Sequence, residues 1–197
     1  MKKKKINFYD ESLYNLKTRL KKNKISLNLF LNKNVLDFGC NNGNYSKSIL
    51  KLGAKKVDAF DFKKKPKNFP KKINYYDNML KLKKSDQLYD FIYCNGVLSH
   101  KKNWKTIIKF LHNLLKKGGY LWISLYPRSQ YWLDMDKISS KLNYKNKNNF
   151  SKLLKLRDWD EGKVYFLQDI LFSKRIYFTK KSIKNFLQKN GFDQIKF

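Results

Sequence analysis

The feature that most constrains the fold is a regular alternation of short apolar segments with amphipathic ones. The short segments are rich in β-branched and aromatic residues and are bounded by turn residues, which favours strands, whereas the others repeat apolar residues at helical spacing. Strands and helices that alternate in this way form β-α-β units with parallel strands and right-handed crossovers. The expected strands are residues 34–39, 55–62, 73–77, 89–96 and 120–127, and the expected helices are residues 10–22, 44–54 and 103–117.

These segments predict a single α/β domain with an open, doubly wound, mostly parallel sheet and helices on both faces. The length of 197 residues suits one domain, and neither a repeat nor a Gly/Ser/Pro-rich linker divides it.

The composition excludes some classes of protein and leaves the meaning of the charge open. The chain carries 45 lysines and arginines against 15 acidic residues, a formal net charge of +30. Basic residues recur along the whole sequence, and compositional drift explains much of them, although their attraction for an acidic partner is physically real. No apolar run approaches the roughly 18 residues that span a bilayer, and no secretory signal follows the basic start. Two cysteines without a zinc-ligand pattern suit a reducing cytoplasm.

The polar residues with chemical potential follow the predicted strands. They lie at residues 37–43, at Asp61, at Asp77 and at residues 95–100. In open α/β sheets, ligands bind outside the carboxyl ends of the strands, at the point where the strand order reverses. Four such groups at one edge of the sheet predict one shared binding site.

The first of these groups carries a family resemblance. The run VLDFGCNNGNYS, residues 35–46, resembles motif I of the class I S-adenosylmethionine-dependent methyltransferases, whose core pattern is D-x-G-x-G-x-G. Asp37, Gly39 and Gly43 match this pattern, and Asn41 replaces its middle glycine. Asparagine tolerates left-handed backbone better than most residues, so the replacement is mild. The resemblance implies a Rossmann-like fold and a loop that binds S-adenosyl-L-methionine. It also implies a late helix within residues 177–192 and a last strand at residues 193–197. Because the family fold normally continues into one further strand, we expect the C-terminal strand pair to be shortened, the alternatives being a partner that covers the open edge or an incomplete sequence.

Later segments resemble the same family in order and spacing. The last acid within residues 57–62 (VDAFDF), Asp61, would bind the ribose hydroxyls, because a carboxylate can accept two hydrogen bonds from a vicinal diol. Residues 75–79 (YYDNM) would place an acid near the adenine amino group, and residues 89–100 (YDFIYCNGVLSH) resemble the fourth strand and its pocket-lining loop. The implied cofactor-binding residues are Asp37, Gly39, Cys40, Asn41, Gly43, Asp61, Phe62, Asp77, Asn78, Asn95, Gly96 and Val97.

Several of these residues have simpler alternatives. A nicotinamide-dependent dehydrogenase also has a glycine-rich first turn and an acid after its second strand, but it needs a close glycine pair to admit a pyrophosphate. Here three residues separate Gly39 from Gly43, and Asp37 would repel a pyrophosphate. Asp37 could also serve only to hold the amides of its own loop, and Cys40 could be a packed side chain. We predict no metal ligands.

The acceptor side is less defined by the sequence. His100 lies just beyond the cofactor-lining loop and could accept a proton near neutral pH, so it is the candidate catalytic residue, although a structural role stays open. Residues 127–175 match no motif and are expected to lie over the acceptor pocket. Four aromatic residues there could form an apolar wall or simply pack the insert onto the sheet, and one of three arginines could hold an anion: Tyr131, Trp132, Trp159 and Tyr165, and Arg128, Arg157 or Arg175. The expected division is residues 1–33 as an N-terminal helical cover, 34–126 as the cofactor-binding core, 127–175 as the insert and 176–197 as the late helix and last strand.

The sequence thus favours an S-adenosylmethionine-dependent methyltransferase that acts on a small-molecule or metabolite acceptor by in-line displacement. An RNA methyltransferase (on tRNA or rRNA) is the alternative that the charge favours. A catalytically silent cofactor-binding subunit and a plain nucleic-acid-binding module are the alternatives from other classes. A homodimer through an open sheet edge is also considered, since an uncovered edge strand invites pairing.

Overall fold

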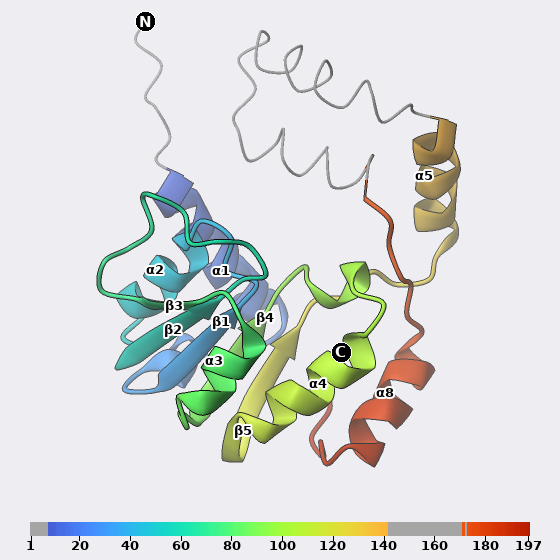
Figure 1. The fold of residues 1–197 in the computed structure, drawn as a ribbon. Helices are drawn as coiled ribbons and strands as arrows, with labels where there is room; N and C mark the ends of the chain where they lie inside the picture. The colour runs from blue at the N-terminus through green and yellow to red at the C-terminus, as the bar shows by residue number, and fades with distance from the viewer. Residues whose placement is uncertain (1–7, 142–170, 172) are drawn as a thin grey trace, which may run out of the picture.

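The computed structural model describes residues 8–141, 171 and 173–197, and in it five parallel strands form one sheet in the order β3-β2-β1-β4-β5 (Figure 1). This order reverses between β1 and β4, which is where ligands bind in sheets of this kind. The predicted open, doubly wound parallel sheet is therefore confirmed. The strands are β1 (Asn34–Phe38), β2 (Lys56–Phe60), β3 (Asn74–Tyr76), β4 (Tyr89–Cys94) and β5 (Leu115–Ile123).

Helices cover both faces of the sheet (Figure 1). Along β1, Val35 packs into a core cluster with residues of α1 and α2, whereas Leu36 and Phe38 pack into a second cluster with α4 and α8. This alternation follows from the two-residue period of a strand, and it lets one strand serve two cores. The helices are α1 (Phe8–Lys22), α2 (Asn44–Lys51), α3 (Met79–Lys84), α4 (Trp104–Asn113), α5 (Gln130–Lys141) and α8 (Lys180–Lys189), with 3₁₀ turns η1 (Leu27–Phe30) and η2 (Leu98–His100).

The start of β5 differs from the sequence-based expectation. Residues 115–117 were expected to end a helix, but α4 stops at Asn113 and β5 begins at Leu115. Tyr89 pairs with Leu115 while Phe91 pairs with Tyr120, so β5 carries a bulge over the intervening residues. Gly118 has φ +74°, which only glycine adopts readily, and it turns the chain back into register. The two glycines therefore form a bulge instead of ending a helix.

The expected final strand is absent. Residues 193–197 were expected to add a strand, but they form no strand in the structure. The Asp193 carboxylate accepts the Gln194 amide at 2.7 Å, and the Asp193 carbonyl accepts the Ile195 amide at 3.1 Å, so the chain turns here. Ile195 then packs against the core that contains α4 and α8. Instead, Phe178 forms a parallel bridge with Pro127 beyond the end of β5.

Two expected units can be located only in part. Helix α1, from the expected N-terminal cover, packs against α2. Of the expected insert, the structure describes residues 127–141, 171 and 173–175, so Arg157, Trp159 and Tyr165 lie outside the described residues. Among the described helices, none has the length and apolar character required to cross a membrane.

Candidate active site at the carboxyl edge of the sheet

The carboxylate at the end of β1 is buried and hydrogen-bonded. Asp37 is 2% exposed, and the hydroxyl of Ser46 in α2 donates a hydrogen bond to its Oδ2 at 2.5 Å. Burial raises the pKa of the Asp37 carboxyl to about 7; the Ser46 hydrogen bond opposes this rise, and the nearby charge of Asp61 adds to it. Asp37 therefore ties the loop after β1 to helix α2 and titrates near neutral pH.

Two glycines bring the loop after β1 close to its neighbours. Gly39 has φ +90°, and a Cβ there would lie 2.1 Å from Cγ2 of Val97, in the loop after β4. Gly43 has φ +79° at the start of α2, and a Cβ there would lie 2.6 Å from the ring of Phe69. Between them, Asn41 has φ +48°, the left-handed backbone conformation that asparagine was expected to tolerate at this position. These contacts leave no room for side chains at either glycine.

Asp61 holds the loop after β1 against the end of β2. Its Oδ2 accepts the Asn41 amide at 2.9 Å and its Oδ1 accepts the Lys63 amide at 3.1 Å. The carbonyl of Phe60 accepts the amide of Gly39 at 2.7 Å, so a backbone hydrogen bond also links the loop after β1 to the end of β2. Asp61 thus lies where the sequence predicted it, half-buried beside the glycine loop.

Phe62 connects the end of β2 with the loop after β4. Its ring packs edge-on against Phe38 and Phe60, with centroid separations of 5.8 and 5.0 Å. The ammonium of Lys101 lies 3.6 Å from the Phe62 ring centroid, a cation–π contact. Phe62 remains 40% exposed, so it presents an apolar surface at this edge.

The residues after β3 have local partners. Asp77 accepts a hydrogen bond from the Lys81 ammonium at 3.0 Å, and this bond and its charge lower the pKa of the Asp77 carboxyl. The Asn78 side chain accepts the Leu80 amide at 2.7 Å and so begins helix α3. These contacts do not test the expected contact of Asp77 with an adenine.

In the loop after β4, Gly96 is exposed and Val97 is buried. Val97 is 8% exposed and fills the space left by Gly39. Gly96 has φ +70° and nothing lies within 4 Å of the place of its missing Cβ, while Asn95 is half-buried. At the end of β4, the carboxyl edge of the sheet thus has open space beside Gly96 and a packed apolar side chain at Val97.

His100 ends the η2 turn that follows this loop. Its Nδ1 lies 3.2 Å from the Lys174 carbonyl oxygen, which can only accept, so Nδ1 carries the proton in this contact. The ring packs edge-on against Tyr126 at a centroid distance of 5.9 Å. The amide of Tyr126 in turn donates to Ser99 Oγ at 3.1 Å. His100 is therefore held by the segments around residues 126 and 174.

A cluster of hydrogen-bonded and aromatic side chains surrounds Arg175, next to the Tyr126 ring that contacts His100. The Arg175 side chain has no exposed surface, and its guanidinium lies 5.4 Å from the ring centroids of both Tyr126 and Trp132. It donates to Asp136 of α5 at 2.6 Å, and the hydroxyl of Tyr177 donates to the same carboxylate at 2.5 Å. Arg175 and Trp132 were named from the sequence as acceptor-side candidates, whereas Asp136 was missed. Its position four residues after Trp132 on one helix was the available signal.

On the other face, Arg19 of α1 reaches the central strands. It donates to the Tyr93 hydroxyl at 3.3 Å and lies 5.5 Å from the ring centroid of Tyr45, in the first turn of α2. Tyr14, also on this helix, is 68% exposed. Helix α1 is thus fixed to the start of α2 through Arg19.

The structure brings the predicted residues of β1, β2 and β4 together and leaves those after β3 at the rim. Cys40 and Cys94 are both buried, and burial raises the pKa of each thiol, so both are packed side chains. Within the part of the chain that the structure describes, no three His, Cys, Asp or Glu side chains could together hold a metal ion.

Comparison with known proteins places this geometry in a family. A family model described as a methyltransferase domain matches residues 9–196. A tRNA U34 carboxymethyltransferase of Helicobacter acinonychis is 33% identical over 132 residues, which cover 59% of this chain and 48% of that protein. A ubiquinone biosynthesis O-methyltransferase of Shewanella pealeana is 29% identical over 107 residues, covering 49% of this chain and 45% of that protein. The chain thus spans about half the length of these curated relatives.

Solved structures share the fold at low identity. An S-adenosylmethionine-dependent methyltransferase of Archaeoglobus fulgidus has a TM-score of 0.59 at 18% identity, covering 93% of this chain and 71% of that one. The magnesium protoporphyrin IX methyltransferase of Synechocystis has a TM-score of 0.58 at 17% identity, covering 98% and 80%. With the matched family model, these likenesses agree with the motif reading: the chain belongs to the class I S-adenosylmethionine-dependent methyltransferase family.

Proposed function

We propose that this chain transfers a methyl group from S-adenosylmethionine to a small-molecule acceptor at the carboxyl edge of the sheet. The observation that carries the proposal is the joint between three loops: Asp61 binds the Asn41 amide, and Gly39 packs against Val97. This joint fixes the ends of β1, β2 and β4 relative to one another before any ligand binds. Preorganisation of this kind is what positioning catalysis requires.

The residues of this edge fit the cofactor in charge and in shape. Each oxygen of Asp61 already accepts one amide, but a carboxylate offers about four acceptor sites, so it retains capacity for two ribose hydroxyls. Gly39 and Gly43 let the loop after β1 pack closely against Val97 and Phe69. Asp37 provides a buried acid, whose ionised form suits a neighbouring cation. When bound, the cofactor supplies an activated methyl group on a sulfonium.

The chain's own contribution would be to hold donor and acceptor in line and to keep water out. In the contact with Lys174, His100 carries its proton on Nδ1, so the neutral ring has Nε2 as its basic nitrogen. Nε2 is the atom that would take a proton from an acceptor hydroxyl or amine. The Tyr126 ring packs against His100, and Trp132 and Arg175 contact Tyr126 in turn, so these three side chains would bound the acceptor.

A tRNA acceptor is the second candidate, and a specific observation favours it. The relative from Helicobacter acinonychis is named for tRNA U34, and a net charge of +30 attracts polyanions at long range. Incubation with methyl-labelled S-adenosylmethionine, a low-molecular-weight cell extract and purified bulk tRNA separates the two candidates. Label in the small-molecule fraction supports the first, and label in tRNA replaces it with the second.

Calorimetry with S-adenosylhomocysteine tests the cofactor residues directly. We expect Asp61→Ala to weaken binding by about 1–3 kcal/mol, because charge-assisted hydrogen bonds to the ribose are lost. Asp134→Ala is the matched control, since it removes an exposed carboxylate of α5 that lies outside the proposed cofactor site. Equal affinity of Asp61→Ala and wild type would mean that the ribose lies elsewhere.

A further inference from the structure

Lysines that are scattered along the sequence meet at one edge of the sheet. All five strands run parallel, so every segment that leads into a strand arrives at the amino edge, opposite Asp37 and Asp61. Lysines precede β3, β2 and β1, and others lie in the first residues of β5. The pairing of Asn34 with Lys56 and of Tyr89 with Leu115 places these entries side by side. The exposed lysines of this amino edge are Lys33, Lys55, Lys71, Lys72 and Lys117.

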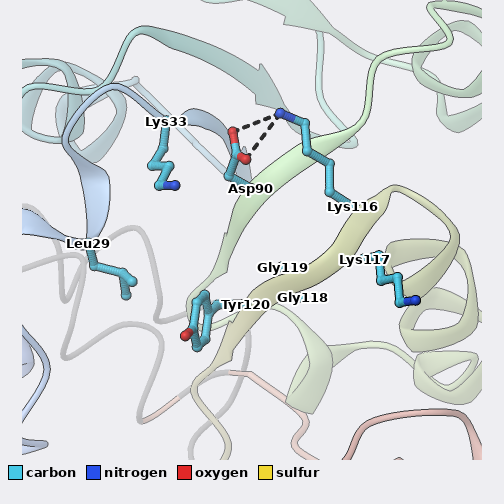
Figure 2. Close-up of a pocket in the computed structure, with 8 residues that line it drawn as sticks. All are labelled: Leu29, Lys33, Asp90, Lys116, Lys117, Gly118, Gly119 and Tyr120. Atoms are coloured by element: carbon cyan, nitrogen blue, oxygen red, sulfur yellow. Dashed lines mark hydrogen bonds and ion pairs between the residues drawn. The ribbon is translucent and has the colours of Figure 1, made fainter.

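A cavity of about 170 Å³ opens at this edge, between the entries to β1, β4 and β5 (Figure 2). The bulge at Gly118 and Gly119 forms one wall, and Lys33, Lys116 and Lys117 are also among the lining residues, with Lys33 and Lys117 on opposite sides of β5 in Figure 2. The one carboxylate in the lining belongs to Asp90. The cavity therefore has more positive than negative charge.

The carboxylate of Asp90 is already fully engaged. It accepts the Asn34 amide at 2.8 Å, and the Lys116 ammonium lies 3.1 Å from both of its oxygens, as the dashed lines in Figure 2 mark. Burial alone would raise the pKa of Asp90, but these partners lower it below its usual value. Among the described residues, neither Lys33 nor Lys117 forms an ion pair, so both charges are available to a ligand.

The other side of the cavity is apolar and aromatic. Leu29 of η1 and Tyr120 of β5 line it, and the Tyr120 side chain is 54% exposed. Figure 2 places both on the side of the cavity away from Lys117. An anion without an apolar group would make no contact with Leu29 and Tyr120. A phosphate joined to a planar base would contact both halves, because bases stack on exposed aromatic rings.

Lys71 and Lys72 continue the basic surface at the β3 end of the same edge. With Lys47, Lys51 and Pro70 they also line a cavity of about 570 Å³, which extends along α2 toward the carboxyl edge, because Pro70 lies beside Gly43. Four strand spacings of about 4.8 Å separate β5 from β3, roughly 19 Å. A span of that length exceeds one nucleotide and suits a chain of several phosphates better than a free mononucleotide.

We propose that the amino edge binds a single-stranded nucleic acid, with successive phosphates on Lys33 and Lys117, which lie on opposite sides of β5 in Figure 2, and a base against Tyr120. This surface lies away from the methyl-transfer edge, so the proposal holds whichever acceptor is methylated. It also assigns a specific role, phosphate binding, to part of the strong basic charge, which otherwise would act only as a diffuse attraction. The predicted contacts are electrostatic and stacking contacts, which read a strand without strict sequence preference.

Fluorescence anisotropy with a short labelled oligouridylate tests the proposal. We expect Lys33→Gln/Lys117→Gln to weaken binding about tenfold at low salt and to reduce the slope of log affinity against log salt by about 1.4, because each lost phosphate contact on a single strand contributes about 0.7. The matched control is Lys109→Gln/Lys184→Gln, which removes the same charge from exposed positions of α4 and α8. The control should change affinity less than about twofold.

Tyr120→Ala supplies a readout that charge alone would not move. Loss of stacking should weaken binding about tenfold and leave the salt slope unchanged. Equal losses in the two double variants would mean diffuse attraction and overturn the proposal. It would also be overturned if uridine monophosphate bound as tightly as the oligonucleotide, since the site would then serve a free nucleotide. S-adenosylhomocysteine affinity of the variants, which the amino edge should not affect, checks their folding.

Discussion

The protonation of Asp37 should make the stability of this protein depend on pH in an unusual direction. Burial raises the pKa of the Asp37 carboxyl from 3.8 to about 7. An acid whose pKa is raised by folding stabilises the native state when it is protonated, so its contribution is complete below about pH 4 and is lost as pH rises toward 7. A rise of about three units corresponds to about 4 kcal/mol over the whole window, at about 1.4 kcal/mol for each unit.

The replacement Asp37→Asn isolates this effect. The asparagine is neutral at every pH and still offers an oxygen to the Ser46 hydroxyl. The free energy of unfolding of wild type should therefore fall by about 2 kcal/mol relative to the variant between pH 5 and pH 7, as all other titrating groups cancel in the difference. Urea titrations at pH 5, 6 and 7 on both proteins measure it. A difference that stays constant with pH would refute a raised pKa at Asp37.

Three further predictions concern packing and buried charge. Gly39→Ala should lower the free energy of unfolding, measured with urea, by about 2–4 kcal/mol, because the alanine strains the backbone and clashes with Val97. Adding Val97→Ala should restore only the part that is due to the clash. Asp58→Ala should cost about 2–4 kcal/mol in the same assay, because Asp58 is fully buried and bonded to three side chains; a loss below about 0.5 kcal/mol would contradict this. A double-mutant cycle with Arg175→Met and Asp136→Asn should give a coupling of about 1–2 kcal/mol, and purely additive changes would show that the two side chains are independent.

The centre of the sheet was predictable because burial on both faces leaves a clear pattern. Strands β1 and β4 lie between two helical layers, so most residues in them are apolar, and their ends are marked by Gly39 and Gly96. Asp61 was placed correctly for the same reason, since it is the first residue after a buried strand. The residues proposed to bind the cofactor are therefore recognisable locally, one loop at a time.

The acceptor side could not be predicted in the same way, because its contacts join distant segments. Asp136 and Arg175 are 39 residues apart, and His100 contacts the Lys174 carbonyl 74 residues away. No local period brings such pairs together. The start of β5 was missed for a different reason: Leu114 and Leu115 continue the apolar period of α4, and only the pairing of Leu115 with Tyr89 decides that the strand begins there.

The distribution of lysines shows how topology can change the meaning of a composition. Along the sequence, Lys33, Lys55, Lys72 and Lys117 look unrelated, and drift is a sufficient explanation for each. A parallel sheet returns the chain to the same edge before every strand, so residues at equivalent points of successive β-α-β units become neighbours. The same rule that gathers Asp37 and Asp61 at the carboxyl edge gathers these lysines at the opposite one. A basic surface in such a fold therefore has to be sought by position relative to the strands, because a search for runs of charge along the sequence would miss it.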